Sequence, residues 1–228
     1  MASFKTHFAV GTAVAGIAAN LCYEAHLSNL QFSVSLWALG AGGSLLPDVD
    51  SDNSLVLKLL FNGLALSAMA FAPFWLAPRL PLVQLVFALA CIYWLVRYPL
   101  MIAFQKFSRH RGVFHSLLAV LFVATLSACF GYRVLQQPAL VCWLAAGFVA
   151  FGYLVHLVLD ECFSVDLVNT TIKRSFGTAL KPMSLQYFGR SLVMALAAAW
   201  FVWLGPPLQG PWQSIARSLV RYFQATWT

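Results

Sequence analysis

Histidine and aspartate residues gather in four short motifs of a chain that otherwise carries little charge. The motifs are THFAVG with His7, SLLPDVDSDNS with Asp48, Asp50 and Asp52, HRGVFHS with His110 and His115, and GYLVHLVLD with His156 and Asp160. Imidazole and carboxylate together are ligands that Zn, Mn and Fe ions take in proteins. The residue types therefore predict a divalent metal centre.

The spacing within the motifs supports shared ligation. His156 and Asp160 are four residues apart, which places them on one face of a helix. Asp48 and Asp50 alternate around Val49 directly after Pro47, where a helix ends or bends. His110 and His115 are five apart, a poor interval for one helix face, so Gly112 is expected to let His110 sit in the turn before the helix.

The number of ligands predicts two ions rather than one, because a catalytic zinc ion usually has three protein ligands and an open position. Zn is the first choice, with Mn or Fe as alternatives. Asp52 is the weakest candidate, since it could cap the next helix with Ser51 and Ser54. The alternative is structural: each histidine could be a hydrogen-bonded core residue and PDVD a charged helix stop. The predicted metal ligands are His7, Asp48, Asp50, His110, His115, His156 and Asp160.

The composition predicts an integral membrane protein, because 61% of the 228 residues are hydrophobic and only 9% are charged. The expected fold is an all-α transmembrane bundle that forms one domain over residues 1–228. We expect about seven spans, although six remain possible. The first two are the weakest and look packed inside the bundle. The spans are expected at about 6–22, 32–47, 55–77, 81–104, 113–134, 138–160 and 185–204.

Alternation of seven spans brings all four motifs to one side of the membrane. The starts of odd spans and the ends of even spans share a side, and every motif lies at such an end. Only His26, after the first span, falls on the other side. Ionisable groups at membrane depth are usually functional, so this convergence favours a site.

The distribution of Lys and Arg predicts the orientation. Four of the fourteen, Arg79, Arg133, Arg217 and Arg221, fall on the side opposite the motifs, and the other ten fall on the motif side. The positive-inside rule then places the N-terminus and the site in the cytoplasm and the C-terminal tail outside. The net charge of +7 is attributed to lipid headgroups, and no nucleic-acid partner and no obligate protein partner are expected.

Three further features complete the expectations. The N-terminal apolar run lacks the pattern of a cleaved signal, so it should remain in the mature protein. The five cysteines stand singly and are expected to be small buried hydrophobes without disulfides. The tail carries Trp212, Ile215, Leu219 and Phe223 at helical spacing, with Arg217 and Arg221 on another face, which predicts an amphipathic helix in the membrane interface.

The four motifs, in this order and spacing, resemble those of the bacterial membrane-bound metal-dependent hydrolases, a group of inner-membrane proteins that includes LexA-regulated members. The resemblance covers about residues 6–181. It implies a multi-pass protein of the bacterial inner membrane whose divalent metal site uses the motif residues. More distantly, the mixed His and Asp ligands are similar to those of zinc-dependent phospholipase C and P1 nuclease.

We therefore expect a hydrolase that cleaves a phosphoester of a phospholipid or lipid-linked substrate. In this interpretation Arg111 neutralises the phosphate, His110 completes the site, and Asp50 or Asp52 serves as general base. Alternatives are a ceramidase-like zinc amidase, a metal-ion or proton-coupled transporter, and a non-catalytic scaffold that a metal ion stabilises. A transporter would hold its ligands near the bilayer midplane, whereas these fall at span ends.

Overall fold

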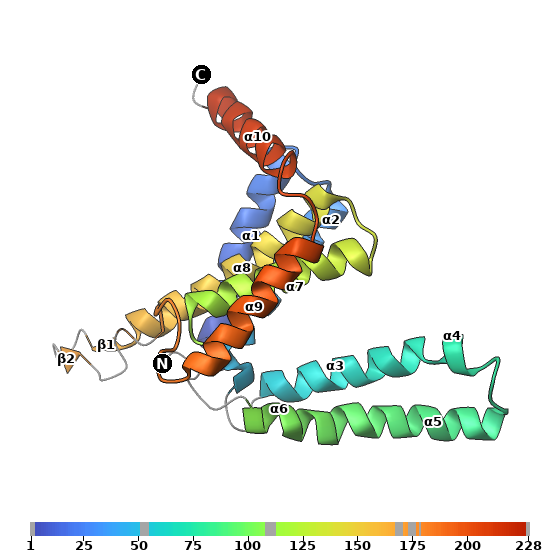
Figure 1. Ribbon diagram of the computed structural model, residues 1–228. Helices are drawn as coiled ribbons and strands as arrows, with labels where there is room; N and C mark the ends of the chain where they lie inside the picture. Colours follow the sequence, from blue (N-terminus) through green and yellow to red (C-terminus); the bar gives the residue numbers. More distant parts are fainter. Residues whose placement is uncertain are drawn as a thin grey trace. The chain divides into compact units, whose positions relative to one another are not determined.

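The protein is described by a computed structural model over residues 3–50, 55–107, 113–166, 171–172, 177 and 179–226. The chain forms two compact units. Unit 1 combines Met1–Pro47 with Val113–Thr228, and unit 2 is Asp48–Gly112. Both units are helical, as predicted (Figure 1).

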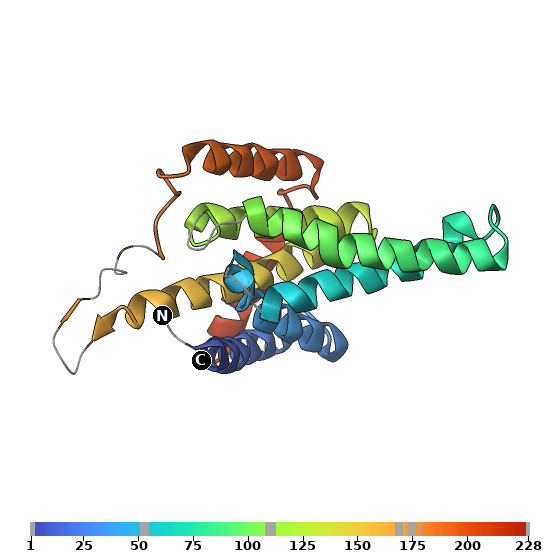
Figure 2. The ribbon, with the colours of Figure 1, turned by 90° about the horizontal axis from the view of Figure 1, so that it is seen from below.

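Unit 1 is a helical bundle built around α8. Helices α1, α2 and α7 each pack against α8, and α9 packs against the outer side of α7. The view from below shows α7, α8 and α9 in successive layers (Figure 2). A short antiparallel pair, Val165–Asp166 (β1) with Thr171–Ile172 (β2), follows α8. The helices of unit 1 are α1 (Phe4–Glu24), α2 (Leu30–Gly43), α7 (Leu117–Arg133), α8 (Ala139–Cys162), α9 (Phe188–Leu204) and α10 (Pro211–Thr226).

Glycines let the helices of unit 1 approach closely. A Cβ atom on Gly152 of α8 would overlap the backbone carbonyl of Gly40 in α2, and one on Gly43 would overlap the carbonyl of Val149. A Cβ on Gly11 of α1 would overlap the Ser44 side chain. Inside a membrane the hydrophobic effect does not drive helices together. Small residues at the contact let the two backbones approach closely and pack. One face of α2 is buried against α1 and α8, whereas Leu30, Val34 and Trp37 stay exposed, so the second segment is only partly packed inside the bundle.

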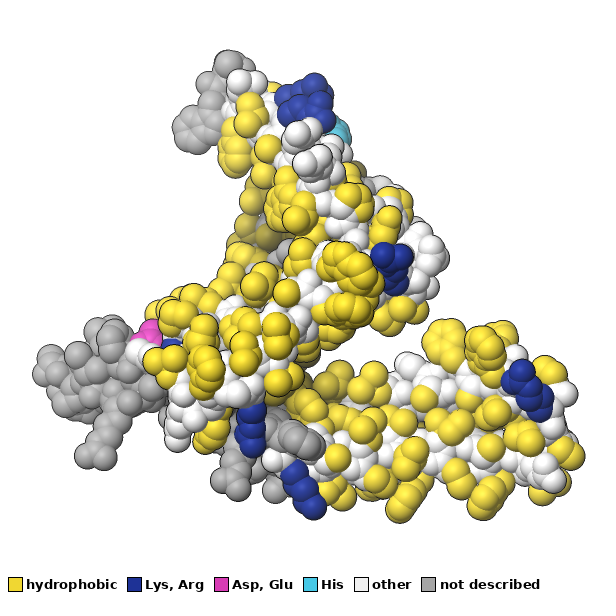
Figure 3. Space-filling model, viewed as in Figure 1, with side chains coloured by type: hydrophobic (Ala, Val, Ile, Leu, Met, Phe, Trp, Pro, Cys, Tyr) yellow, Lys and Arg dark blue, Asp and Glu magenta, His cyan; other side chains and the backbone are white. Residues whose placement is uncertain are grey.

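Unit 2 is a long helical hairpin. Its first arm contains α3 (Leu55–Phe71) and α4 (Pro73–Leu76), and its second contains α5 (Leu82–Leu95), a π-helical turn η2 (Val96–Leu100) and α6 (Met101–Phe107). A 3-10 turn, η1 (Leu46–Asp50), precedes it along the chain. No side chain of α5 is buried, and hydrophobic side chains cover most of the visible surface of the hairpin (Figure 3). Such a surface suits lipid rather than water.

Among the residues that the structure describes, three helical segments are long and apolar enough to cross a membrane: Leu55–Leu76, Leu82–Lys106 and Ala139–Cys162. They match the third, fourth and sixth predicted spans. The prediction of seven spans is not supported. Helix α2 has 14 residues, about 21 Å, and α7 and α9 have 17 each, about 25 Å, against hydrocarbon of about 30 Å. Helix α1 has 21 residues, but polar side chains such as Asn20 and Glu24 interrupt its apolar run.

The tail forms the predicted amphipathic helix, α10. Trp212 packs its ring against Trp143 of α8, with ring centroids 6.1 Å apart, and Ile215 packs against the core formed by α1, α2 and α8. Phe223 stays 51% exposed. All five cysteines lie in the described residues and are free, as predicted. Cys129 and Cys142 are buried, whereas Cys91 and Cys162 are exposed, so burial was predicted correctly for only some of them.

Candidate metal centre

Four of the predicted ligands meet in unit 1, and each lies near the end of a helix. His7 is in the first turn of α1, and His115 lies just before α7, which begins at Leu117. His156 and Asp160 lie on one face of the last two turns of α8. The predicted convergence of these four residues is therefore observed, although the seven alternating spans from which it was inferred are not.

Asp160 is the common partner of the three histidines. Its Oδ1 atom lies 3.2 Å from Nε2 of His7. Its Oδ2 atom lies 3.6 Å from Nε2 of His115 and 3.6 Å from Nε2 of His156. Each of the four residues is at most 3% exposed. The cluster is therefore a dry polar site inside an apolar bundle.

A backbone carbonyl fixes the orientation of His156. Its Nδ1 lies 2.7 Å from the carbonyl oxygen of Ser44. Because a carbonyl can only accept a hydrogen bond, the proton is on Nδ1. In the neutral ring the lone pair is then on Nε2, the atom that faces Asp160. In metal-binding histidines, a backbone carbonyl often accepts a hydrogen bond from the ring nitrogen that does not bind the metal.

The ring of His7 stacks on that of His156, with centroids 3.6 Å apart and planes 10° apart. Two protonated imidazoles would repel each other at this distance. Nδ1 of His7 is buried and makes no hydrogen bond within the described residues, whereas its Nε2 faces Oδ1 of Asp160. A buried nitrogen without a hydrogen bond is costly, and a bound cation would satisfy it.

The charges of the cluster favour a cation. Three protonated imidazoles facing one carboxylate would leave two net positive charges in a dry site, which is strongly unfavourable. In the neutral tautomer that the Ser44 carbonyl selects, His156 presents its Nε2 lone pair toward the carboxylate. His7, His156 and Asp160 each offer a ligand atom, and these atoms lie within 4.8 Å of one another. The cluster could hold a metal ion.

Neighbouring residues fix the loop that carries His115. The hydroxyl of Tyr153, on α8, donates a 2.7 Å hydrogen bond to the carbonyl of Phe114. Ser116 caps α7 by accepting a hydrogen bond from the amide of Ala119. Both residues are buried to 0% exposure. His115 is thus held between α7 and α8.

The segment 179–184, called the strap here, crosses the start of α7. The amides of Leu117 and Leu118 each donate a 3.0 Å hydrogen bond to the strap, at Lys181 and Pro182. At its other end, Glu161 of α8 accepts hydrogen bonds from the amides of Gly177 and Ala179. The strap therefore joins the His115 end of α7 to the Asp160 end of α8.

The other predicted site residues lie in unit 2 or outside the described side chains. Asp48 belongs to unit 2, and its ligation stays a prediction. The backbone of Asp50 is in η1, but its side chain lies outside the described residues, as do Asp52, His110 and Arg111. Their roles also stay predictions.

Sequence reasoning missed three residues that position the cluster. The Ser44 carbonyl is a backbone group, and no side-chain pattern indicates it, although Gly40 and Gly43 mark a close helix contact nearby. Tyr153 was detectable, because it lies three residues before His156 and seven before Asp160 on the same helix face. Glu161 was detectable only as one of seven acidic residues.

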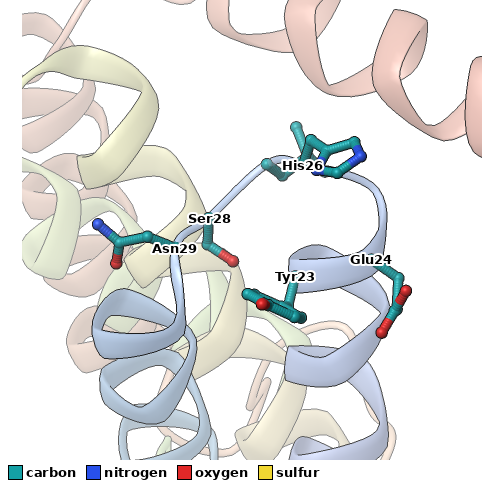
Figure 4. A pocket seen from close by; sticks show the side chains of 6 residues that line it. Tyr23, Glu24, His26, Ser28 and Asn29 are labelled. Carbon is teal, nitrogen blue, oxygen red and sulfur yellow. The ribbon is translucent and has the colours of Figure 1, made fainter.

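His26 lies apart from the cluster, as predicted. It is in the turn between α1 and α2, nineteen residues or about 28 Å along the helix axis from His7. Its φ of 54° is in the left-handed region. Together with Tyr23, Glu24, Leu27, Ser28 and Asn29 it lines a surface pocket (Figure 4).

Comparison with known proteins gives a family. A family model described as YdjM inner membrane protein matches residues 1–203, which include all four motifs and end before α10. No curated protein and no solved structure matches the chain. The match covers most of the chain and agrees with its long apolar helices. This chain therefore belongs to the YdjM inner membrane protein family.

Proposed function

We propose that this protein is a membrane-embedded metal-dependent hydrolase that cleaves a phosphoester bond of a phospholipid or lipid-linked substrate. The observation that carries the proposal is the cluster of three imidazoles around one carboxylate, all at most 3% exposed. Few structural roles require so many ionisable groups in one dry place, because each is costly to bury.

The position of the cluster favours hydrolysis over transport. His7, His115, His156 and Asp160 all lie at helix ends, where lipid headgroups and water meet the bundle. A transport pathway would place its ligands near the bilayer midplane. A phosphoester in a headgroup region lies at the depth of helix ends, so this location suits a lipid substrate.

In the proposed site His7, His115, His156 and Asp160 hold the metal, with Zn as first choice. Two ions would also require Asp48, Asp50 and His110. A divalent cation there would supply Lewis-acid polarisation of a phosphoryl oxygen and a more acidic water. The chain's own contribution is orientation: the Ser44 carbonyl fixes the ring of His156, and Tyr153 fixes the backbone before His115.

Three further roles belong to the proposal. Arg111 would make a bidentate contact with the substrate phosphate. Asp50 would accept a proton as general base, provided that metal does not engage it fully. The strap would control entry to the cluster, because the described side chains leave the ligands almost no exposed surface.

The proposal is tested by metal content. The full chain is purified in mild detergent without chelator, together with a double variant, His156→Ala with Asp160→Ala. We expect about two equivalents of Zn, Mn or Fe in the wild type and none in the variant. His26→Ala is the matched control, because His26 lies at the opposite end of α1 and should leave the metal content unchanged.

Activity is then tested on vesicles of phosphatidic acid and of phosphatidylglycerol. Release of phosphate or of a phosphorylated headgroup by the wild type, lost in the double variant, would support the proposal. Folded protein that takes up neither Zn nor Mn would remove the mechanism. Metal without phosphoester cleavage, but with cleavage of ceramide vesicles, would favour the amidase instead.

A further inference from the structure

Unit 2 contains a charged side chain inside a membrane-length apolar segment. Arg97 lies in Leu82–Lys106, one of the three segments that could cross a membrane. It is nine residues before Lys106, which is about 13 Å along the helix. An arginine at such a depth is costly unless a polar partner compensates for it.

The polar partner within the hairpin is neutral. Oδ1 of Asn62, on α3, accepts a 2.8 Å hydrogen bond from Nε of Arg97 and a 2.9 Å hydrogen bond from the hydroxyl of Tyr93. The Nη1 group of Arg97 lies 3.0 Å from Sδ of Met101, a weak acceptor. These contacts hold the guanidinium in place, but none of them carries the negative charge that would balance it.

The hairpin offers no carboxylate for this purpose. Residues 55–107 contain Lys58, Arg79, Arg97 and Lys106 but neither Asp nor Glu. Among the described residues no ion pair joins Arg97 to an acid, and no hydrogen bond involves its Nη2. The counter-charge for Arg97 must come from outside the hairpin.

The local backbone places Arg97 at the surface of unit 2. Pro99 has no amide proton to donate, so the helix takes a π-turn over Val96–Leu100. Such turns are rare and often occur at functional sites. Tyr98 and Trp94, on either side, are 46% and 59% exposed, and Arg97 itself is only partly buried. The guanidinium is therefore accessible at the surface of unit 2.

We propose that Arg97, positioned by Asn62 and Tyr93, binds the phosphate of an anionic membrane lipid. The lipid phosphate would provide the missing negative charge and accept bidentate hydrogen bonds from the guanidinium. A depth of about 13 Å is close to half the hydrocarbon thickness of about 30 Å. The phosphate therefore reaches the guanidinium only if the long side chain extends toward the headgroups and the bilayer thins locally with entry of water. Aromatic residues beside the site suit the apolar part of the lipid.

This lipid site is independent of the proposed hydrolase activity. It lies in unit 2, uses none of the predicted metal ligands and concerns a bound lipid rather than a reacting one. Loss of metal from the histidine cluster would leave it unaffected, and loss of lipid from Arg97 would leave the metal content unaffected. Failure of one proposal can therefore be told apart from failure of the other.

The decisive variant is Asn62→Asp. It keeps an oxygen that accepts from both Arg97 and Tyr93, so the hairpin contact survives, but it cancels the charge of the guanidinium. A purely structural role for Arg97 predicts that this change is harmless. The proposal predicts loss of lipid. Arg97→Gln removes the charge directly. Arg79→Gln is the matched control, because the exposed guanidinium of Arg79 donates to the carbonyl of Trp75 at the hairpin tip.

The full chain, stripped of lipid in detergent, is titrated with phosphatidylglycerol or phosphatidylcholine, and bound lipids are counted by native mass spectrometry. We expect the wild type and Arg79→Gln to prefer phosphatidylglycerol. Asn62→Asp and Arg97→Gln should bind it about tenfold more weakly, with unchanged elution and thermal unfolding.

Three results would overturn the proposal. The first is a wild-type protein that binds phosphatidylglycerol no more tightly than phosphatidylcholine. This result is obtained from the wild type alone. The second is a folded Asn62→Asp protein that retains the preference. The third is displacement of the lipid by an equal concentration of inorganic phosphate, which would identify a site for free phosphate instead.

Discussion

Asp160 is the residue on which the histidine cluster depends. Its two oxygens face the Nε2 atoms of His7, His115 and His156 at 3.2 to 3.6 Å. Asp160→Asn keeps the shape of the side chain but removes its charge. Removal of a group that only orients a metal ligand lowers metal affinity by about 10- to 100-fold. Loss of the Asp160 charge should therefore lower Zn affinity by more than about 100-fold. Competition with a fluorescent Zn chelator measures the change.

The control for this substitution is Glu24→Gln, which removes a carboxylate from the exposed end of α1. It should leave Zn affinity unchanged. If Asp160→Asn bound Zn as tightly as the wild type, the carboxylate would not be a ligand, and the cluster would have to be explained as a hydrogen-bonded structural group.

At the scale of elements, the contact between α2 and α8 sets the position of the Ser44 carbonyl relative to His156. Gly152→Ala should separate these helices, because the added Cβ would overlap the Gly40 carbonyl. We expect a loss of about 1–3 kcal/mol in the free energy of unfolding together with reduced metal content. Thermal unfolding in detergent measures the first and mass spectrometry the second.

Gly147 on the same helix provides the matched control. A Cβ there meets nothing within 4 Å, and the residue is exposed. Gly147→Ala should therefore raise the unfolding free energy by about 0.5–1 kcal/mol through its greater helix propensity. Equal effects of the two substitutions would show that the close contact does not position the cluster.

The strap makes a prediction of its own. Glu161→Gln replaces one accepting oxygen by an NH2 group, so one of the hydrogen bonds from Gly177 and Ala179 is lost. A hydrogen bond to a charged group contributes about 1.5–3 kcal/mol. The amides of Leu117 and Leu118, which bond to the strap, should then exchange with deuterium at least about tenfold faster. Unchanged exchange would mean that Glu161 does not hold the strap closed.

Elements with a regular pattern were predictable from the sequence, whereas contacts made by the backbone were not. His156 and Asp160 share a face because of helical spacing, and α10 shows its two faces in the sequence alone. The Ser44 carbonyl and the partnership of Arg97 with Asn62 depend on where helices cross, which no local pattern specifies. The predicted number of spans failed because a run of apolar residues does not fix where a helix begins and ends: α2, α7 and α9 are short, and polar residues interrupt α1.

At the scale of the whole molecule, the two units differ in how much of their apolar surface they bury. Unit 1 buries residues from several helices against α8, whose membrane-length segment is 56% buried. In unit 2 the segment Leu82–Lys106 is 0% buried. A chain that encloses a polar cluster in one unit and exposes apolar helices in the other is built for lipid surroundings. The family match to an inner membrane protein agrees with this.

The hairpin of unit 2 makes the orientation testable. Lys58 and Lys106 lie near its open end, whereas Arg79 lies at its tip. In sequence, Lys58 follows the PDVD motif and Lys106 precedes HRGVFHS. Arg109 and Arg111 follow the second arm, so the positive-inside rule puts the open end in the cytoplasm and the tip outside. An alkaline phosphatase fusion after Pro81 should be active, and one after Phe107 inactive. The opposite pattern would put the motifs on the outer side, and the substrate would then have to be sought among lipids of the outer leaflet.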